Sequence, residues 1–89
     1  MKVVSDSGPL LSFARAGRLD ILHQVFGEIV IPDAVFEEIT IHGKGKPGAT
    51  EIEAGSWISC CSVRDKTIPS RLSRNLNAGE AEAIALAME

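Results

Sequence analysis

The sequence has no excess of basic residues. Its 89 residues include 9 Lys and Arg against 12 Asp and Glu, and the formal net charge is −3. No global positive field therefore attracts nucleic acid. Any phosphate contact must be local, through lysine and arginine side chains in loops. Ordinary solvated surface charge explains the presence of these side chains equally well. These cations form two groups, Lys44 with Lys46, and Arg64 with Lys66, Arg71 and Arg74.

Cysteine and histidine are scarce. Cys60 and Cys61 are neighbours, and adjacent cysteines do not easily reach normal disulfide geometry or supply a metal cage alone. We expect buried, reduced thiols. His23 and His42 have no spacing that resembles a zinc pair, so we expect both at the surface.

Long apolar runs and export signals are absent as well. No apolar run approaches the ~20 residues needed to span a bilayer. The N-terminus has no cationic segment or small-residue cleavage site. We therefore expect a cytoplasmic protein with no membrane role. Hydrophobic residues make up 45% of the chain, enough for one small domain that buries roughly 60% of its unfolded surface.

The pattern of apolar and turn residues indicates an α/β fold. β-Prone runs predict strands over residues 2–5, 28–31 and 57–63. Apolar residues at helical spacing predict helices that end at Gly17, Gly27 and Gly43. A short helix over residues 49–54, a polar connection and a last helix over residues 78–89 complete the chain. Strands that alternate with helices predict a parallel sheet covered by helices.

The last helix has a clear start and no clear end. Asn77 and Glu80 match a capping box at its start. No glycine, proline or basic residue follows to stop it. We therefore expect residues 1–89 to be the N-terminal portion of a single domain.

Several acidic residues are candidates for chemistry. Asp6 follows the first strand, and functional crevices in open α/β sheets lie at the carboxyl ends of strands. A helix N-cap is the alternative, which Ser7 could provide equally well. On the third helix, Glu37 lies opposite the apolar face and is expected to be solvated, whereas Glu38 lies nearer its flank and is the better site candidate.

The last helix is apolar almost all the way round, which is typical of a helix buried on most sides. Capping and the helix dipole explain Glu80. Glu82 has no such explanation, and a carboxylate on a buried helix needs a cation or strong donors. Oxygen ligands from Asp and Glu suit Mg²⁺ or Mn²⁺. We expect Asp6, Glu38 and Glu82 to converge on one concave surface that holds one or two ions.

These residues resemble the motifs of the PIN-domain family. Residues 4–11, VSDSGPLL, resemble the opening of PIN domains, and residues 31–39, IPDAVFEEI, look like the second motif, in which Glu38 is the functional acid. Residues 76–87, LNAGEAEAIALA, are similar to the third motif of a subfamily with Gly-Glu-Ala-Glu in place of a single Asp. Glu82 then matches the usual acid, and Glu80 is an additional one.

The resemblance to VapC-type toxin ribonucleases implies a Rossmann-like PIN fold and RNA cleavage that depends on Mg²⁺ or Mn²⁺. Asp6, Glu38 and Glu82 would be catalytic metal ligands, Glu80 a further ligand, and Ser7 a residue that orients Asp6 or a bound water. RNA and an antitoxin protein would be the partners. The family continues with C-terminal strands and a fourth acidic motif, so we expect this chain to be impaired as a nuclease and to associate with itself or another chain.

Two other functions remain open. A non-catalytic PIN-like fragment could act as a protein-binding module. A receiver-like signalling domain also places an Asp at a strand end, but the acidic cluster that it requires at the first strand is not present.

Overall fold

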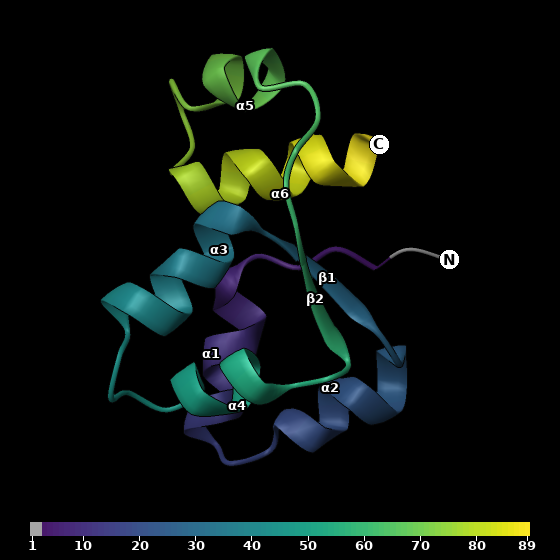
Figure 1. Cartoon of the computed structure of the whole chain (residues 1–89), viewed down its shortest axis with the longest axis vertical. Coiled ribbons are helices and arrows are strands. Elements are labelled where there is room, and N and C mark those ends of the chain that lie inside the picture. Colours follow the sequence, from purple (N-terminus) through teal and green to yellow (C-terminus); the bar gives the residue numbers. More distant parts are fainter. Residues whose placement is uncertain (1–2) are drawn as a thin grey trace.

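The computed structural model describes residues 3–89 and has an α/β architecture (Figure 1). Strands β1 (Ile29–Pro32) and β2 (Ile58–Cys61) form a two-stranded parallel sheet in which Ile29 lies opposite Ile58. The helices are α1 (Ser7–Arg15), α2 (Leu19–Phe26), α3 (Asp33–Glu37), the π-helical turn η1 (Glu38–His42), α4 (Ala49–Ala54), α5 (Thr67–Leu72) and α6 (Ala78–Met88). The α/β expectation is confirmed.

The predicted first strand is reduced to a single bridge. Val4 pairs in parallel with Val30, and Lys2 lies outside the described residues. The Ser5 amide donates to the Val30 carbonyl at 3.1 Å, and the Val30 amide donates to the Val3 carbonyl at 2.8 Å. β1 therefore lies between the N-terminal segment and β2.

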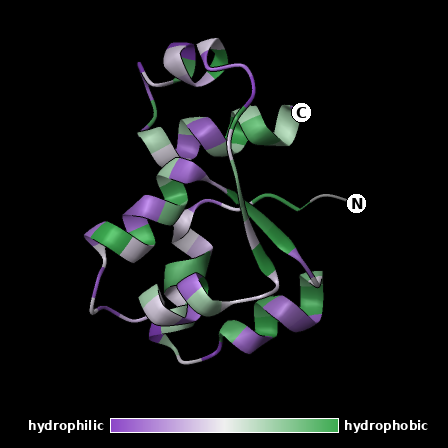
Figure 2. Cartoon of the chain, viewed as in Figure 1, coloured by the Kyte–Doolittle hydropathy of each residue, from purple (hydrophilic) through white to green (hydrophobic). Residues whose placement is uncertain are grey.

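Helices cover both faces of the sheet because side chains alternate along β1. Ile29 and Ile31 point into a core formed with α1, α2, α3, η1 and α4, whose other buried members are Leu10, Leu22, Val35, Ile39 and Ile52. Val30 faces the other way and packs on a second core of Val63, Ala85 and Leu86. Figure 2 shows hydrophobic residues along both strands and the N-terminal segment. Burial of each such aliphatic side chain stabilises the fold by about 1.5–3 kcal/mol.

The helix ends follow the glycines. Gly17 and Gly27 each have φ of 70°, a left-handed conformation that residues with a Cβ rarely adopt, and they follow α1 and α2 as predicted. The helix predicted up to Gly43 is not regular, because α3 gives way to η1. Within η1 the buried Thr40 hydroxyl donates to the Phe36 carbonyl at 2.7 Å. Such side-chain bonds compete with the regular helical ladder.

The connection predicted between residues 64 and 76 contains a helix, α5, which the sequence pattern did not indicate. Its first turn is held by Asp65, whose carboxylate accepts from the Thr67 amide at 3.0 Å and from the Thr67 hydroxyl at 2.6 Å. The remaining support is tertiary, because α5 packs on α6.

The prediction that the cysteines are buried is wrong. Cys60 and Cys61 are both exposed and unbridged. They lie on β2, which within residues 3–89 pairs with β1 only, so their strand is at an edge of the sheet. Val63, just after β2, is the buried residue of this segment, with 2% of its surface exposed. His23 and His42 are exposed as predicted.

Helix α6 begins as predicted but is less buried than expected. The Asn77 side chain accepts from the Glu80 amide at 2.8 Å, and Glu80 accepts from the Asn77 amide at 3.2 Å, so the capping box is confirmed. α6 packs on α5, α3 and β1. Ile84 and Met88 nevertheless expose 44% and 68% of their surfaces. Across residues 3–89, no helix is long and apolar enough to cross a bilayer.

Candidate acidic site

Asp6 lies between the N-terminal bridge and α1, at the N-cap position of that helix. Its backbone is extended, with φ −91° and ψ −171°, but its carboxylate makes no capping hydrogen bond. The side chain is half-buried, and its Oδ1 lies 3.6 Å from where a Cβ on Gly8 would stand. Helix capping therefore does not explain this carboxylate.

Glu80 shares a pocket with Asp6. The pocket has a volume of about 390 Å³. Its walls are the N-terminal segment and one side of α6, and its lining residues are Val4, Ser5, Asp6, Pro9, Leu76, Glu80, Ala83, Ile84 and Ala87. Glu80 uses Oε1 in the capping box, and its Oε2 has no hydrogen bond within the described part of the chain. Two carboxylates thus face one concave, mainly apolar surface.

Glu82 lies on another side of α6. Two residues correspond to about 200° around an α-helix, and Glu82 borders a separate pocket with Lys66, Pro69 and Ser70. Its Oε1 accepts a hydrogen bond from the Ala34 amide at 3.1 Å. Ala34 is in the first turn of α3, where backbone amides lack helical partners. The half-buried carboxylate therefore has a strong donor, and a cation is not needed to explain it.

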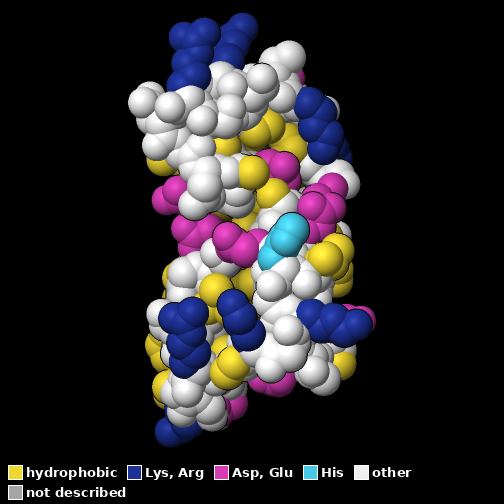
Figure 3. All heavy atoms as spheres, turned by 90° about the vertical axis from the view of Figure 1, so that its left-hand side faces the viewer, with side chains coloured by type: hydrophobic (Ala, Val, Ile, Leu, Met, Phe, Trp, Pro, Cys, Tyr) yellow, Lys and Arg dark blue, Asp and Glu magenta, His cyan; other side chains and the backbone are white. Residues whose placement is uncertain are grey.

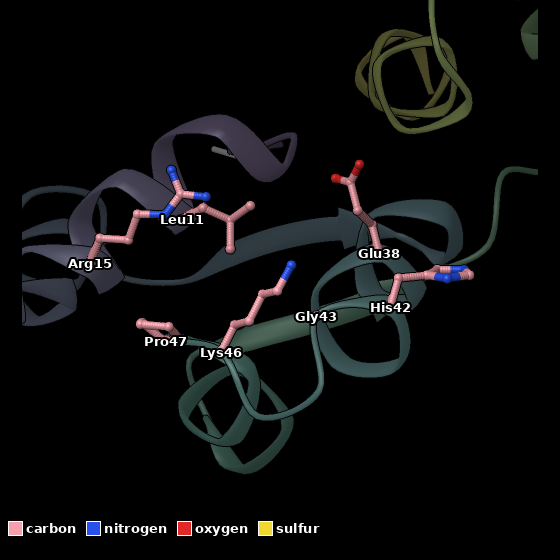
Figure 4. A pocket seen from close by; sticks show the side chains of 7 residues that line it. All are labelled: Leu11, Arg15, Glu38, His42, Gly43, Lys46 and Pro47. Atoms are coloured by element: carbon pink, nitrogen blue, oxygen red, sulfur yellow. The ribbon is translucent and has the colours of Figure 1, made fainter.

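Glu38 begins η1 and lines a third pocket, of about 280 Å³. In Figure 4 its carboxylate and the ammonium of Lys46 lie apart from each other. It has no hydrogen bond or ion pair with any residue in 3–89. Glu37 is exposed, as its predicted solvated position requires.

The predicted ligands are therefore distributed over three pockets. Within residues 3–89, no group of three or more His, Cys, Asp or Glu side chains is placed to hold an ion. On the broader scale, Figure 3 shows acidic side chains across the middle of one face, with Lys and Arg above and below. The structure brings Asp6 together with Glu80 and leaves Glu38 and Glu82 each in a different pocket. The functional roles of these acids, and of Ser7, stay predictions.

Asp33 is an acid at a strand end that the sequence reasoning did not single out. Ser62 Oγ donates to Asp33 Oδ2 at 2.5 Å, and Cys60 Sγ donates to Oδ1 at 3.2 Å. The Ser62 hydrogen bond, followed by that of Cys60, lowers the pKa of Asp33. Asp33 directly follows β1, and Ser62 directly follows β2. The meeting of parallel strands at their carboxyl ends was the signal that could have found this pair.

Cys60 is held as a thiol. Partial burial of its sulfur, and next its hydrogen bond to Asp33, raise the pKa of the Cys60 thiol to about 12. The exposure of this residue therefore does not make it a reactive nucleophile, since the thiolate is the reactive species.

A comparison with models of protein families identifies the family of this chain. The family model described as the PIN domain matches residues 2–89, nearly the whole chain. Comparisons with curated proteins and with solved structures found no match. The parallel sheet flanked by helices is consistent with that family. The chain belongs to the PIN-domain family.

Proposed function

We propose that this protein is a metal-dependent endoribonuclease and the toxin of a toxin–antitoxin pair. PIN-domain membership indicates a nuclease-type function, and PIN nucleases generally use divalent metal ions and bind RNA. The observation that supports the proposal most is Asp6. Its half-buried carboxylate follows the N-terminal segment that pairs with Val30, caps no amide and shares a pocket with Glu80.

The donor chemistry fits a hard divalent ion. Asp6, Glu38, Glu80 and Glu82 offer carboxylate oxygens only, the ligand type that Mg²⁺ and Mn²⁺ prefer. Glu38 is exposed and has no partner in residues 3–89, so its side chain is free to turn. Glu80 and Glu82 each keep one oxygen outside the hydrogen bonds that they accept. Asp6 and Glu80, which share a pocket, would be the first ligands. Glu38 and Glu82 line other pockets and would join the set only after a change in side-chain position.

A bound ion supplies a water nucleophile at neutral pH and neutralises charge that develops on the scissile phosphate. The protein contributes position. Asp6 is set by the Val4 bridge on one side and the start of α1 on the other. Glu82 accepts a hydrogen bond from the Ala34 amide and so connects α6 to the first turn of α3. This contact fixes the position of α6 relative to α3. Ser7 is adjacent to Asp6 and would orient its carboxylate or a water.

Cleavage of single-stranded RNA by the purified protein in Mn²⁺ tests the activity. We expect Asp6→Asn to lower the rate at least about 100-fold, the upper end of what losing an outer-shell partner of a metal site costs. Glu37→Gln, which removes an exposed carboxylate near Glu38, is the matched control and should cleave normally. Equal rates in the wild-type protein and Asp6→Asn would refute the assignment. For the toxin role, expression of the wild-type protein should arrest growth of a host cell, and expression of Asp6→Asn should not.

A second candidate function, binding of another protein chain, is favoured by the N-terminal segment. Val3 and Ser5 bond to Val30, so the Val4 amide and carbonyl face away from β1 and have no partner among residues 3–89. Unpaired strand edges readily pair with another strand. Beside this edge lies an apolar pocket of about 490 Å³, bordered by Val3, Phe13, Val25 and Phe26. The occupant that fits is an extended strand of a partner chain, an antitoxin or a second copy.

A further inference from the structure

The pocket at Glu38 is rich in charge that is not paired internally. Arg15 at the end of α1 and Lys46 in the loop between η1 and α4 line it together with Glu38. Figure 4 shows the guanidinium, ammonium and carboxylate groups at separate points around the pocket, while the His42 ring points away from it. The ion pair found in residues 3–89 is Arg18 with Asp20, elsewhere on the surface. Opposite charges thus share a pocket of about 280 Å³ without joining.

Backbone structure holds the two cations near each other. The Lys46 amide donates to the Gly43 carbonyl at 2.9 Å, which folds the loop into a turn. Two residues later, Gly48 has φ of 100°, and a Cβ there would stand 2.9 Å from the Cβ of Ala14. Only glycine allows both this conformation and this approach. The loop is therefore docked against α1 next to Arg15, and Lys46 is presented to the same pocket.

We propose that Arg15 and Lys46 form a binding subsite for a backbone phosphodiester of single-stranded RNA, in the pocket that Glu38 also lines. The inference rests on the proposed ribonuclease function. Two cations and one carboxylate give this pocket a formal charge of 2 − 1 = +1, which complements one phosphodiester. The guanidinium offers a planar pair of donors to phosphate oxygens, and the ammonium adds a point charge. Glu38, one of the proposed metal ligands, lines the same pocket, so an RNA strand held here reaches a proposed ligand.

Fluorescence anisotropy with a labelled single-stranded RNA oligonucleotide, in EDTA so that no cleavage occurs, tests the subsite. Each phosphate contact on single strands contributes about 0.7 to the slope of log affinity against log salt. At 0.1 M salt one contact therefore raises the affinity about fivefold over its value at about 1 M salt. We expect Arg15→Gln and Lys46→Gln each to lose that amount. Lys44→Gln is the matched control, because Lys44 is an exposed lysine in the same loop that does not line the pocket.

The charge-conserving variants Arg15→Lys and Lys46→Arg should keep most of the affinity, which separates loss of charge from loss of fold. An equal loss in Lys44→Gln, unchanged binding in both pocket variants, or equal competition by poly-glutamate would overturn the subsite. Binding of inorganic phosphate to the pocket, together with an RNA affinity that neither substitution changes, would also overturn the subsite. Binding without metal is independent of cleavage. RNA bound through the pocket but not cut in Mn²⁺ would therefore reject the ribonuclease function alone.

Discussion

The carboxylate of Glu82 accepts a hydrogen bond from the backbone amide of Ala34 at 3.1 Å. The two residues are 48 positions apart in the sequence. This contact joins α6 to the first turn of α3 and places a negative charge at the positive end of that helix. A residue proposed as a metal ligand therefore also has a structural task.

The Glu82–Ala34 contact should contribute measurably to stability. We expect Glu82→Ala to lower the free energy of unfolding by about 1 kcal/mol, the usual cost of losing a capping side chain, while Glu82→Gln should lose less. Urea denaturation followed by circular dichroism measures the change. Glu37→Ala is the control, because that side chain is exposed. A loss in Glu82→Ala no greater than in the control would contradict the capping role.

Divalent ions should stabilise the protein if the acidic residues bind them. Ligand linkage raises the free energy of unfolding by about 2.7 kcal/mol at an ion concentration of 100 times Kd, so Mn²⁺ or Mg²⁺ should raise Tm. Asp6→Asn and Glu82→Gln should weaken this response, and Glu37→Gln should leave it unchanged. Differential scanning fluorimetry gives the comparison. The same Tm shift in all four proteins would mean that the ions bind elsewhere.

Asp33 should make stability depend on pH in the acid range. Its pKa is lowered in the folded state, first by the Ser62 hydroxyl. The stabilisation is therefore fully present above the unfolded value of about 3.9 and is lost as pH falls through the lower folded value. Ser62→Ala should raise the pKa of Asp33 and weaken this dependence. Carboxyl NMR titration measures it, and Ser59→Ala, at an exposed position on β2, is the control. An unchanged Asp33 titration in Ser62→Ala would rule out this cause.

Cys60 should alkylate slowly despite its exposure. Partial burial, and next the hydrogen bond to the Asp33 carboxylate, raise its pKa to about 12. The negative charge of Asp33 disfavours the thiolate. Asp33→Asn removes this charge, so the substitution should lower the pKa of the Cys60 thiol and speed its reaction with iodoacetamide at pH 8. The rates are compared by mass spectrometry in a Cys61→Ser background, so that modification reports on one sulfur. Equal rates with and without the Asp33 charge would show that partial burial alone controls this thiol.

Association through the N-terminal edge should depend on the apolar pocket beside it. Phe26 lines this pocket and exposes 49% of its surface. We expect the wild-type protein to associate as its concentration rises, and Phe26→Lys to reduce association, because a charged side chain opposes burial. Analytical ultracentrifugation follows the change. Gln24→Lys adds the same charge to an exposed position of α2 outside the pocket. A wild-type protein that stays monomeric at high concentration would exclude this surface as a self-association site.

The sequence by itself determined those features that depend on neighbouring residues. Gly17 and Gly27 end their helices because each needs a backbone conformation that a Cβ opposes. Asn77 and Glu80 form the capping box within a single turn. The PIN-domain family was also readable from sequence, because the order of its expected motifs along the chain is itself sequence information.

Tertiary structure decided which side chains meet. Cys60 is exposed because β2 lies at an edge of the sheet, and α5 forms where it can pack on α6. Pairing of β1 with β2 brings Ser62 to Asp33. The packing of α6 on α3 gives Glu82 its donor and leaves Glu80, not Glu82, in the pocket of Asp6. Helical periodicity states which residues share a face, but only the packing of that face against distant segments determines its partners.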